Sequence, residues 1–150
     1  MSSFDLSKPI AVGGDHAGFD YKAAVVEWLT EKGYQIIDKG VFSNKSADYP
    51  DYAHPVANLV EQGLAGCGIL ICGSANGVCM TANKHQGIRA ALCWQSDATR
   101  LSRQHNDANI ACIPARFIAL EYAKQQIEIF LETQFEGGRH ATRVNKIACM

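Results

Sequence analysis

The sequence predicts an α/β fold in which a five-stranded parallel sheet is covered by helices on both faces. Two observations lead to this expectation. Short apolar runs alternate with segments of helical periodicity along the whole chain. The runs are continuously apolar rather than alternating, which is typical of strands that are buried on both faces of a parallel sheet. Together they predict a three-layer, Rossmann-like α/β/α sandwich.

Five runs are expected to form the strands: Pro9 to Val12, Tyr34 to Asp38, Gly68 to Cys72, Ile88 to Cys93 and Asn109 to Ile113. Between the first two, a helical stripe is formed by Tyr21, Ala24, Val25, Trp28 and Leu29. Gly33 can terminate that helix. A second stripe near the C-terminus is formed by Leu120, Ala123, Ile127, Phe130 and Leu131. The one long irregular segment is Phe42 to Pro55, and long loops in compact domains are often functional.

Length and composition indicate a single domain over residues 1–150, because 150 residues with 47% hydrophobic content can bury one core. The net charge of -1 argues against a nucleic-acid binder or a membrane-surface protein, which would carry a basic surface. Residues 1–10 do not have the pattern of a signal peptide, and no apolar run approaches the roughly 20 residues of a membrane span. We therefore expect a cytosolic protein. The six cysteines form no CxxC pair and are expected to be reduced.

Residues 68–84, GILICGSANGVCMTANK, carry the strongest chemical signal. The apolar run ends in Cys72, and the loop Gly73-Ser74-Ala75-Asn76-Gly77 follows directly. Small residues let the backbone turn tightly and direct N–H groups to one place, and the predicted next helix adds its positive N-terminal dipole. The sequence thus predicts a thiol with a lowered pKa beside an anion hole. The alternative is that Cys72 is an ordinary buried strand cysteine. The loop matches neither GxxxxGK[ST] nor GxGxxG, so ATP and dinucleotides are disfavoured.

Asp15 and His16 also belong to the predicted site, because ligands in open α/β sheets bind at the carboxyl ends of the strands. Both residues follow the first strand, where they could serve in acid/base chemistry or hold a hydroxyl group. Asp15 could instead only cap the next helix.

Two further groups come from the C-terminal half. His105 and Asn106 end the fourth predicted helix. His105 could be a general acid/base, or only a favourable cation at the helix end with Asn106 as a left-handed cap, and the two interpretations are compatible. Arg139 and Arg143 lie in the first turns of a last helix, at about 138–149, where cations oppose the helix dipole unless an anion is bound. A solvated basic helix end is the alternative. Arg116, just after the fifth strand, could join this phosphate group.

Six motifs in this order resemble one known family: GGDHAG (13–18), DYPDYA (48–53), ILICGSANG (69–77), ANKHQGIRA (82–90), LSRQHNDAN (101–109) and EGGRH (136–140). The chain resembles the ribose-5-phosphate isomerase B family, which also includes allose-6-phosphate isomerases and the subunits of galactose-6-phosphate isomerase. The resemblance implies interconversion of ribose 5-phosphate and ribulose 5-phosphate through an enediolate, with no metal or organic cofactor. It also implies a cytoplasmic enzyme of pentose phosphate metabolism.

The same resemblance implies a role for each matched residue. Cys72 corresponds to the base, residues 73–77 to the oxyanion hole with Ser74 among the catalytic groups, and His105 to the ring-opening residue. Asp15 and Asn106 would bind sugar hydroxyls, and Tyr49 would border the ring. The phosphate shell would be His16, Arg116, Arg139 and Arg143. A homodimer or tetramer with a composite active site is implied, the C-terminal helix packing on the partner subunit.

Two departures from the family pattern concern the loop. Ser74 stands where many relatives have Thr, which keeps the hydroxyl, and Ala75 stands where they have Gly. If position 75 requires a positive φ, Ala there costs on the order of 1 kcal/mol. The alternatives to ribose 5-phosphate isomerisation are isomerisation of a six-carbon sugar phosphate (allose or galactose 6-phosphate) and a non-catalytic, flavodoxin-like sugar-phosphate-binding module. A thiol redox protein is disfavoured by the missing CxxC.

Overall fold

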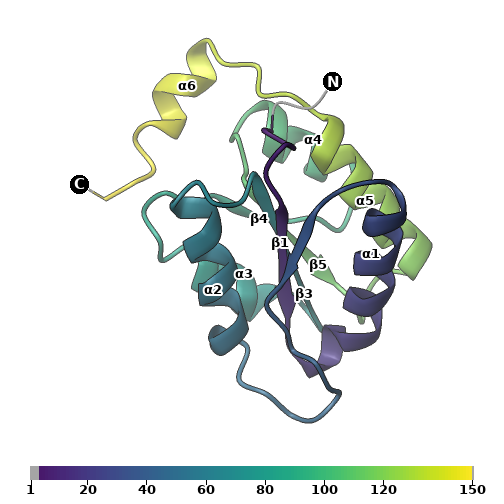
Figure 1. Cartoon of the computed structure of the whole chain (residues 1–150). Coiled ribbons are helices and arrows are strands. Elements are labelled where there is room, and N and C mark those ends of the chain that lie inside the picture. The colour runs from purple at the N-terminus through teal and green to yellow at the C-terminus, as the bar shows by residue number, and fades with distance from the viewer. Residues whose placement is uncertain (1–3, 150) are drawn as a thin grey trace.

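The computed structural model describes residues 4–149 and is built around a five-stranded sheet (Figure 1). Its strands are β1 (Ile10–Gly14), β2 (Ile36–Asp38), β3 (Cys67–Cys72), β4 (Ala90–Leu92) and β5 (Ile110–Pro114). Their order is β2-β1-β3-β5-β4, and every neighbouring pair is parallel. The predicted five-stranded parallel sheet is confirmed.

Helices cover both faces of the sheet (Figure 1). One face carries α1 (Phe19–Glu31), α4 (Ser96–Gln104) and α5 (Leu120–Glu132), and the other carries α2 (Pro50–Glu61) and α3 (Asn76–Ala82). Successive strand residues supply the two cores in turn: Ile69 and Ile71 pack with α1 and α5, whereas Leu70 packs with α2 and α3. This alternation is the reason that the runs are continuously apolar.

Both predicted helical stripes are present. In α1, Val25 and Leu29 are buried, and the chain turns at Gly33, whose φ is +95°. The Gly33 N–H donates to Thr30 O and the Tyr34 N–H donates to Leu29 O, which closes the helix end as expected. In α5 the buried residues are Ala123, Gln126, Ile127, Phe130 and Leu131.

Several predicted boundaries are wrong. The irregular segment ends at Tyr49 rather than Pro55, because Pro50 is the first residue of α2, where its missing N–H costs nothing. The outer strands β2 and β4 are shorter than their apolar runs. The last helix, α6, spans only Arg139–Val144 and buries none of its residues. A short helix without a packed face is not stable enough to extend further.

The carboxyl edge of the sheet is tightly built where β1 meets β3. β1 extends through Gly13 and Gly14, which pair with Leu70 and Ile71. A Cβ atom at Gly14 or Gly18 would overlap Ile71 O. Glycine at these two positions therefore lets the segment after β1 lie directly against the end of β3.

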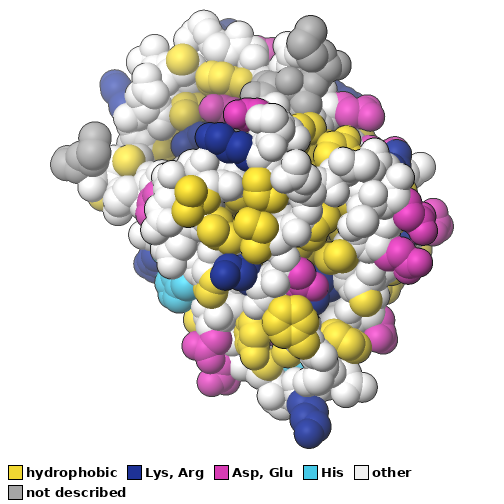
Figure 2. All heavy atoms as spheres, viewed as in Figure 1, with side chains coloured by type: hydrophobic (Ala, Val, Ile, Leu, Met, Phe, Trp, Pro, Cys, Tyr) yellow, Lys and Arg dark blue, Asp and Glu magenta, His cyan; other side chains and the backbone are white. Residues whose placement is uncertain are grey.

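Other global expectations concern cysteines, charge and hydropathy. All six cysteines are free. Basic and acidic side chains are intermixed on the face drawn in Figure 2. Among residues 4–149, none of the helices has the length and apolar character required to cross a membrane.

Candidate active site

A thiol and a carboxylate meet at the carboxyl edge of the sheet. Cys72 ends β3, Asp15 follows β1, and the Cys72 thiol donates a hydrogen bond to Asp15 Oδ2 over 3.1 Å. Each residue is 7% exposed. The strand order reverses between β1 and β3, and such switch points are where open α/β sheets bind ligands. We call Cys72, Asp15 and the 73–77 loop the thiol site.

Asp15 caps a helix, as one interpretation of the sequence expected, and also contacts the thiol. Its Oδ1 accepts from the N–H groups of Ala17 (3.0 Å) and Gly18 (3.3 Å), which caps the short 3-10 helix η1 (His16–Gly18). Its Oδ2 remains for the thiol. Capping thus holds the carboxylate in the orientation that serves Cys72.

The expected lowering of the thiol pKa is wrong for the chain by itself. Burial raises the pKa of Cys72 to about 11, and the hydrogen bond to Asp15 and the negative charge of Asp15 add to the effect. The N–H groups of Gly73 and Ala75 act in the opposite direction but are outweighed. The sequence identified both the loop and Asp15, but not that the fold places this carboxylate beside the sulfur of Cys72.

The turn from β3 into α3 depends on Ala75. This residue has φ +63° and is fully buried. Position 75 therefore does require a left-handed backbone conformation. Gly77 follows under the ring of Tyr49, and a Cβ atom at Gly77 would lie 2.5 Å from Tyr49 Cζ. The loop therefore has a strained residue at its centre and an aromatic ring packed over its end.

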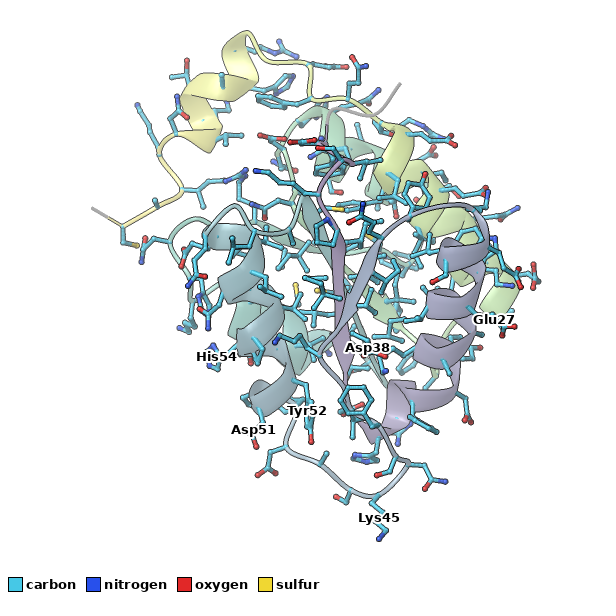
Figure 3. The ribbon with its side chains drawn as sticks, viewed as in Figure 1. Glu27, Asp38, Lys45, Asp51, Tyr52 and His54 are labelled. Atoms are coloured by element: carbon cyan, nitrogen blue, oxygen red, sulfur yellow. The ribbon has the colours of Figure 1, made fainter. Side chains whose placement is uncertain are left out.

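Three other predicted residues surround the thiol site. His16 Nδ1 accepts from the Ala47 N–H (3.1 Å), so its Nε2 carries the proton of the neutral ring. This bond ties His16 to the irregular segment that precedes α2. Lys45 lies at the tip of that segment in Figure 3. Ser74 Oγ accepts from the Asn76 N–H (3.3 Å), and the Arg116 side chain lies 3.2 Å from a Cβ atom placed on Gly73.

The remaining predicted residues form a second cluster. A groove of about 440 Å³ is lined by His105, Asn106, Arg139, His140 and Arg143. The rings of His105 and His140 stack with centroids 4.1 Å apart. Burial and the neighbouring His105 and Arg139 lower the pKa of His140. We call this set the imidazole–arginine groove.

The two clusters lie at opposite edges of the sheet. His105 and Asn106 precede β5, whereas Arg116 follows it. A strand rises about 3.3 Å per residue, so a five-residue strand separates its two ends by on the order of 15 Å. Figure 1 shows α6 at the end of the molecule opposite the segment before α2. One chain does not bring its thiol and its predicted ring-opening histidine together.

Two assignments in the second cluster need correction. Arg116 lies over Gly73 in the thiol site and does not join Arg139 and Arg143. The left-handed residue after α4 is Asp107, with φ +48°, and not Asn106. Asp107 is held there because its Oδ1 accepts from Arg103 and its carbonyl accepts from Arg89.

An apolar pocket that was not predicted from the sequence lies beside the 73–77 loop. Its volume is about 280 Å³, and its lining is Ser74, Asn76, Leu92, Trp94, Pro114, Phe117 and Ile118. The carboxyl-edge rule would have found it, because Trp94 and Phe117 follow β4 and β5 closely. Glu136 and His140 were also missed as neighbours of His105.

Comparison with known proteins agrees with this arrangement. Residues 10–147 match the model of the Ribose/Galactose Isomerase family. The chain belongs to this family. It is 46% identical over 143 residues to ribose-5-phosphate isomerase B of Escherichia coli K12, and the alignment covers 95% of this chain and 96% of that protein.

Solved structures show the same fold. A ribose 5-phosphate isomerase of Thermotoga maritima superposes with a TM-score of 0.92 at 45% identity, covering 94% of this chain and 97% of the other. A second structure is ribose-5-phosphate isomerase B of Mycoplasma genitalium, solved with bound ribulose 5-phosphate. It superposes with a TM-score of 0.90 at 39% identity, covering 95% of each chain. The fold and the family expected from the six motifs are confirmed.

Proposed function

We propose that the chain interconverts ribose 5-phosphate and ribulose 5-phosphate through an enediolate, with Cys72 as the base. The observation that carries the proposal is the hydrogen bond from the Cys72 thiol to Asp15 at the sheet's switch point. The two solved structures described above are both of ribose 5-phosphate isomerases, and the one from Mycoplasma genitalium contains bound ribulose 5-phosphate. A cytosolic location is part of this proposal.

The reaction moves one proton between two carbons. The Cys72 thiolate takes the proton from C2 of the open-chain aldose, the electron pair forms the C1–C2 double bond, and the C1 oxygen becomes the oxyanion. The same thiol then returns the proton to C1, while the proton of the C2 hydroxyl passes to the C1 oxygen. The backbone N–H groups of the 73–77 loop are suited to hold the oxyanion, because such donors need no reorganisation. Asp15 can accept the proton that leaves the thiol.

Groups at opposite edges of one chain can serve one site only if two copies combine. We therefore place the imidazole–arginine groove of a second copy over the thiol site. His105 and Asn106 then supply ring opening and hydroxyl binding, and Arg139 and Arg143 hold the phosphate with His16, while Arg116 and Tyr49 border the loop. A homodimer is the smallest assembly that meets this requirement, and a tetramer would meet it as well.

This assembly would also offset the raised pKa of the Cys72 thiol. In the chain alone, Cys72 faces a carboxylate, which raises its pKa. Arginine side chains of a second copy would add positive charge near the sulfur and favour the thiolate. The base becomes competent only when the composite site is complete.

The function is tested by solvent exchange and turnover. In deuterated water, ribose 5-phosphate should gain deuterium at C2 and yield ribulose 5-phosphate. Cys72→Ala should lose far more than tenfold in rate, whereas Cys149→Ser, which removes an exposed thiol, should keep the wild-type rate. A binding module would show neither exchange nor turnover, and survival of Cys72→Ala within about tenfold would remove the thiol from the mechanism. Isomerisation rates measured side by side on ribose 5-phosphate, allose 6-phosphate and galactose 6-phosphate show whether the enzyme prefers a five- or a six-carbon sugar.

A further inference from the structure

The EGGRH motif contributes two side chains that the proposed reaction does not use. Glu136 Oε1 lies 3.5 Å from His140 Nε2 and 3.7 Å from His105 Nε2. One ligand atom from each of the three residues can be chosen so that all lie within 4.8 Å of one another. Glu136 is half exposed and His105 is 38% exposed at the side chain, so water and ions reach them.

We propose that His105, Glu136 and His140 bind one divalent transition-metal cation, with Zn²⁺ as the representative. Two imidazole nitrogens and one carboxylate oxygen are a ligand set that Zn²⁺ accepts with three protein ligands and one open position. At metal–ligand distances of about 2.0–2.1 Å, neighbouring ligands of a tetrahedral site lie roughly 3.3 Å apart. The two observed distances of 3.5 and 3.7 Å exceed this edge only slightly.

Ligation requires a small rearrangement of the two rings. They are now stacked at an interplanar angle of 10°, so their nitrogens do not yet converge on one point. Rotation about the last side-chain torsion, which has broad minima, opens the pair. His105 is the C-cap residue of α4 and its side chain is 38% exposed, so its ring can turn, whereas the side chain of His140 in α6 is 13% exposed.

The surrounding charges limit the affinity. Arg139 and Arg143 line the same groove and repel a cation, and Glu136 supplies one negative charge. The site should therefore bind reversibly and more weakly than a structural zinc site, which is closed by four ligands. A reversible site at the edge of a substrate groove is suited to inhibition rather than to folding.

The consequence for catalysis rests on the proposed function. A bound cation occupies the Nε2 lone pair of His105, so this imidazole can no longer exchange protons with the sugar ring. Zn²⁺ should therefore inhibit the isomerase, and a chelator should restore the full rate. The proposed mechanism itself uses no metal.

Binding is measured first, without substrate, on the full-length chain carrying Cys149→Ser to remove the exposed thiol. Zn²⁺ is titrated by calorimetry, and Co²⁺ is used as a spectroscopic probe. We expect one ion per chain, the visible bands of tetrahedral Co²⁺, and no thiolate charge-transfer band. Glu136→Gln and His140→Gln should each weaken binding by roughly 10- to 100-fold or more. Circular dichroism checks that these surface variants remain folded.

The matched control is His54→Gln, because His54 Nδ1 and His85 Nε2 form another exposed imidazole pair 2.7 Å apart. This variant should bind Zn²⁺ like the parent. Unchanged binding in both Glu136→Gln and His140→Gln, or loss of binding in His54→Gln, would overturn the site. Zn²⁺ binding with wild-type turnover at saturation would overturn the inhibition. A metal-binding protein with no turnover of any sugar phosphate would overturn the proposed function and leave the site standing.

Discussion

At the scale of single residues, the proposed chemistry depends on the contact between Cys72 and Asp15. The carboxylate is fixed by capping η1, so its second oxygen stays directed at the thiol. The pair is buried, and the negative charge stabilises the thiol against ionisation. Asp15 therefore sets how readily the base forms.

Asp15→Asn should lower the pKa of Cys72 from about 11, because the amide removes the charge yet still caps the helix. Below its pKa a thiol gains about tenfold in thiolate per pH unit, so each unit of lowering speeds alkylation about tenfold at pH 8. Iodoacetamide labelling of the Cys72 peptide against pH, read by mass spectrometry, measures the change. Asp20→Asn in α1 is the control and should label like the wild type. Equal labelling of Asp15→Asn and wild type would contradict this role.

Ala75 is the second decisive residue. A non-glycine residue at φ +63° is strained, and the strain lies within the loop that carries the proposed oxyanion hole. Alanine at this position does not abolish the turn. It stores strain beside the base.

Ala75→Gly should raise the free energy of unfolding by about 0.5–1 kcal/mol, because relief of the positive-φ strain outweighs the added freedom of the unfolded chain. Urea unfolding measures the change. Ala82→Gly, at the right-handed end of the same helix, should lower stability by about 1 kcal/mol or more. If both variants lose stability alike, the loop does not strain Ala75.

At the scale of elements, the connection from α4 to β5 determines where His105 and Asn106 lie. Arg103 is fully buried beneath it and donates to Asp107 Oδ1 (2.9 Å), Ala108 O (2.5 Å) and Thr133 O (3.1 Å). Its guanidinium also lies over the ring of Phe4 at 4.0 Å from the centroid. One side chain thus joins the His105 connection to the segment that leads into EGGRH.

Arg103→Met should lower the free energy of unfolding by about 2–4 kcal/mol, because two buried carbonyls lose their donor. Turnover should fall beyond the loss of folded protein, since His105 is no longer positioned. Arg100→Met, an exposed arginine of the same helix paired with Asp97, should change stability by less than about 1 kcal/mol. Denaturation and single-turnover rates on both variants measure these effects. Wild-type turnover in folded Arg103→Met would contradict the positioning role.

Periodicity predicted several elements that pack on a core but misplaced the ends of two helices. The α1 and α5 stripes and the three central strands were predictable because burial imposes their pattern. The start of α2 at Pro50 and the end of α6 at Val144 depend on proline tolerance and on missing packing, which hydrophobicity does not show.

At the scale of the whole molecule, the sequence predicted nearly every member of the two clusters but not their separation. The carboxyl-edge rule identified Asp15, Cys72 and the loop, because these follow strands directly. His105 and Asn106 precede β5, so the parallel sheet places them at its opposite edge, and this separation was not predicted. The thiol pKa was mispredicted for a related reason, since Asp15 reaches Cys72 only through the pairing of β1 with β3.

The central claim is that Cys72 of one copy works with His105 of another. The direct measurement mixes Cys72→Ala and His105→Ala chains by joint unfolding and refolding and then assays ribose 5-phosphate isomerisation. Each variant alone should be inactive. Random pairing gives mixed dimers in about half of the population, each with one complete site, so about a quarter of the wild-type activity should return. A mixture of folded, associated chains that stays as inactive as its components would contradict the composite site.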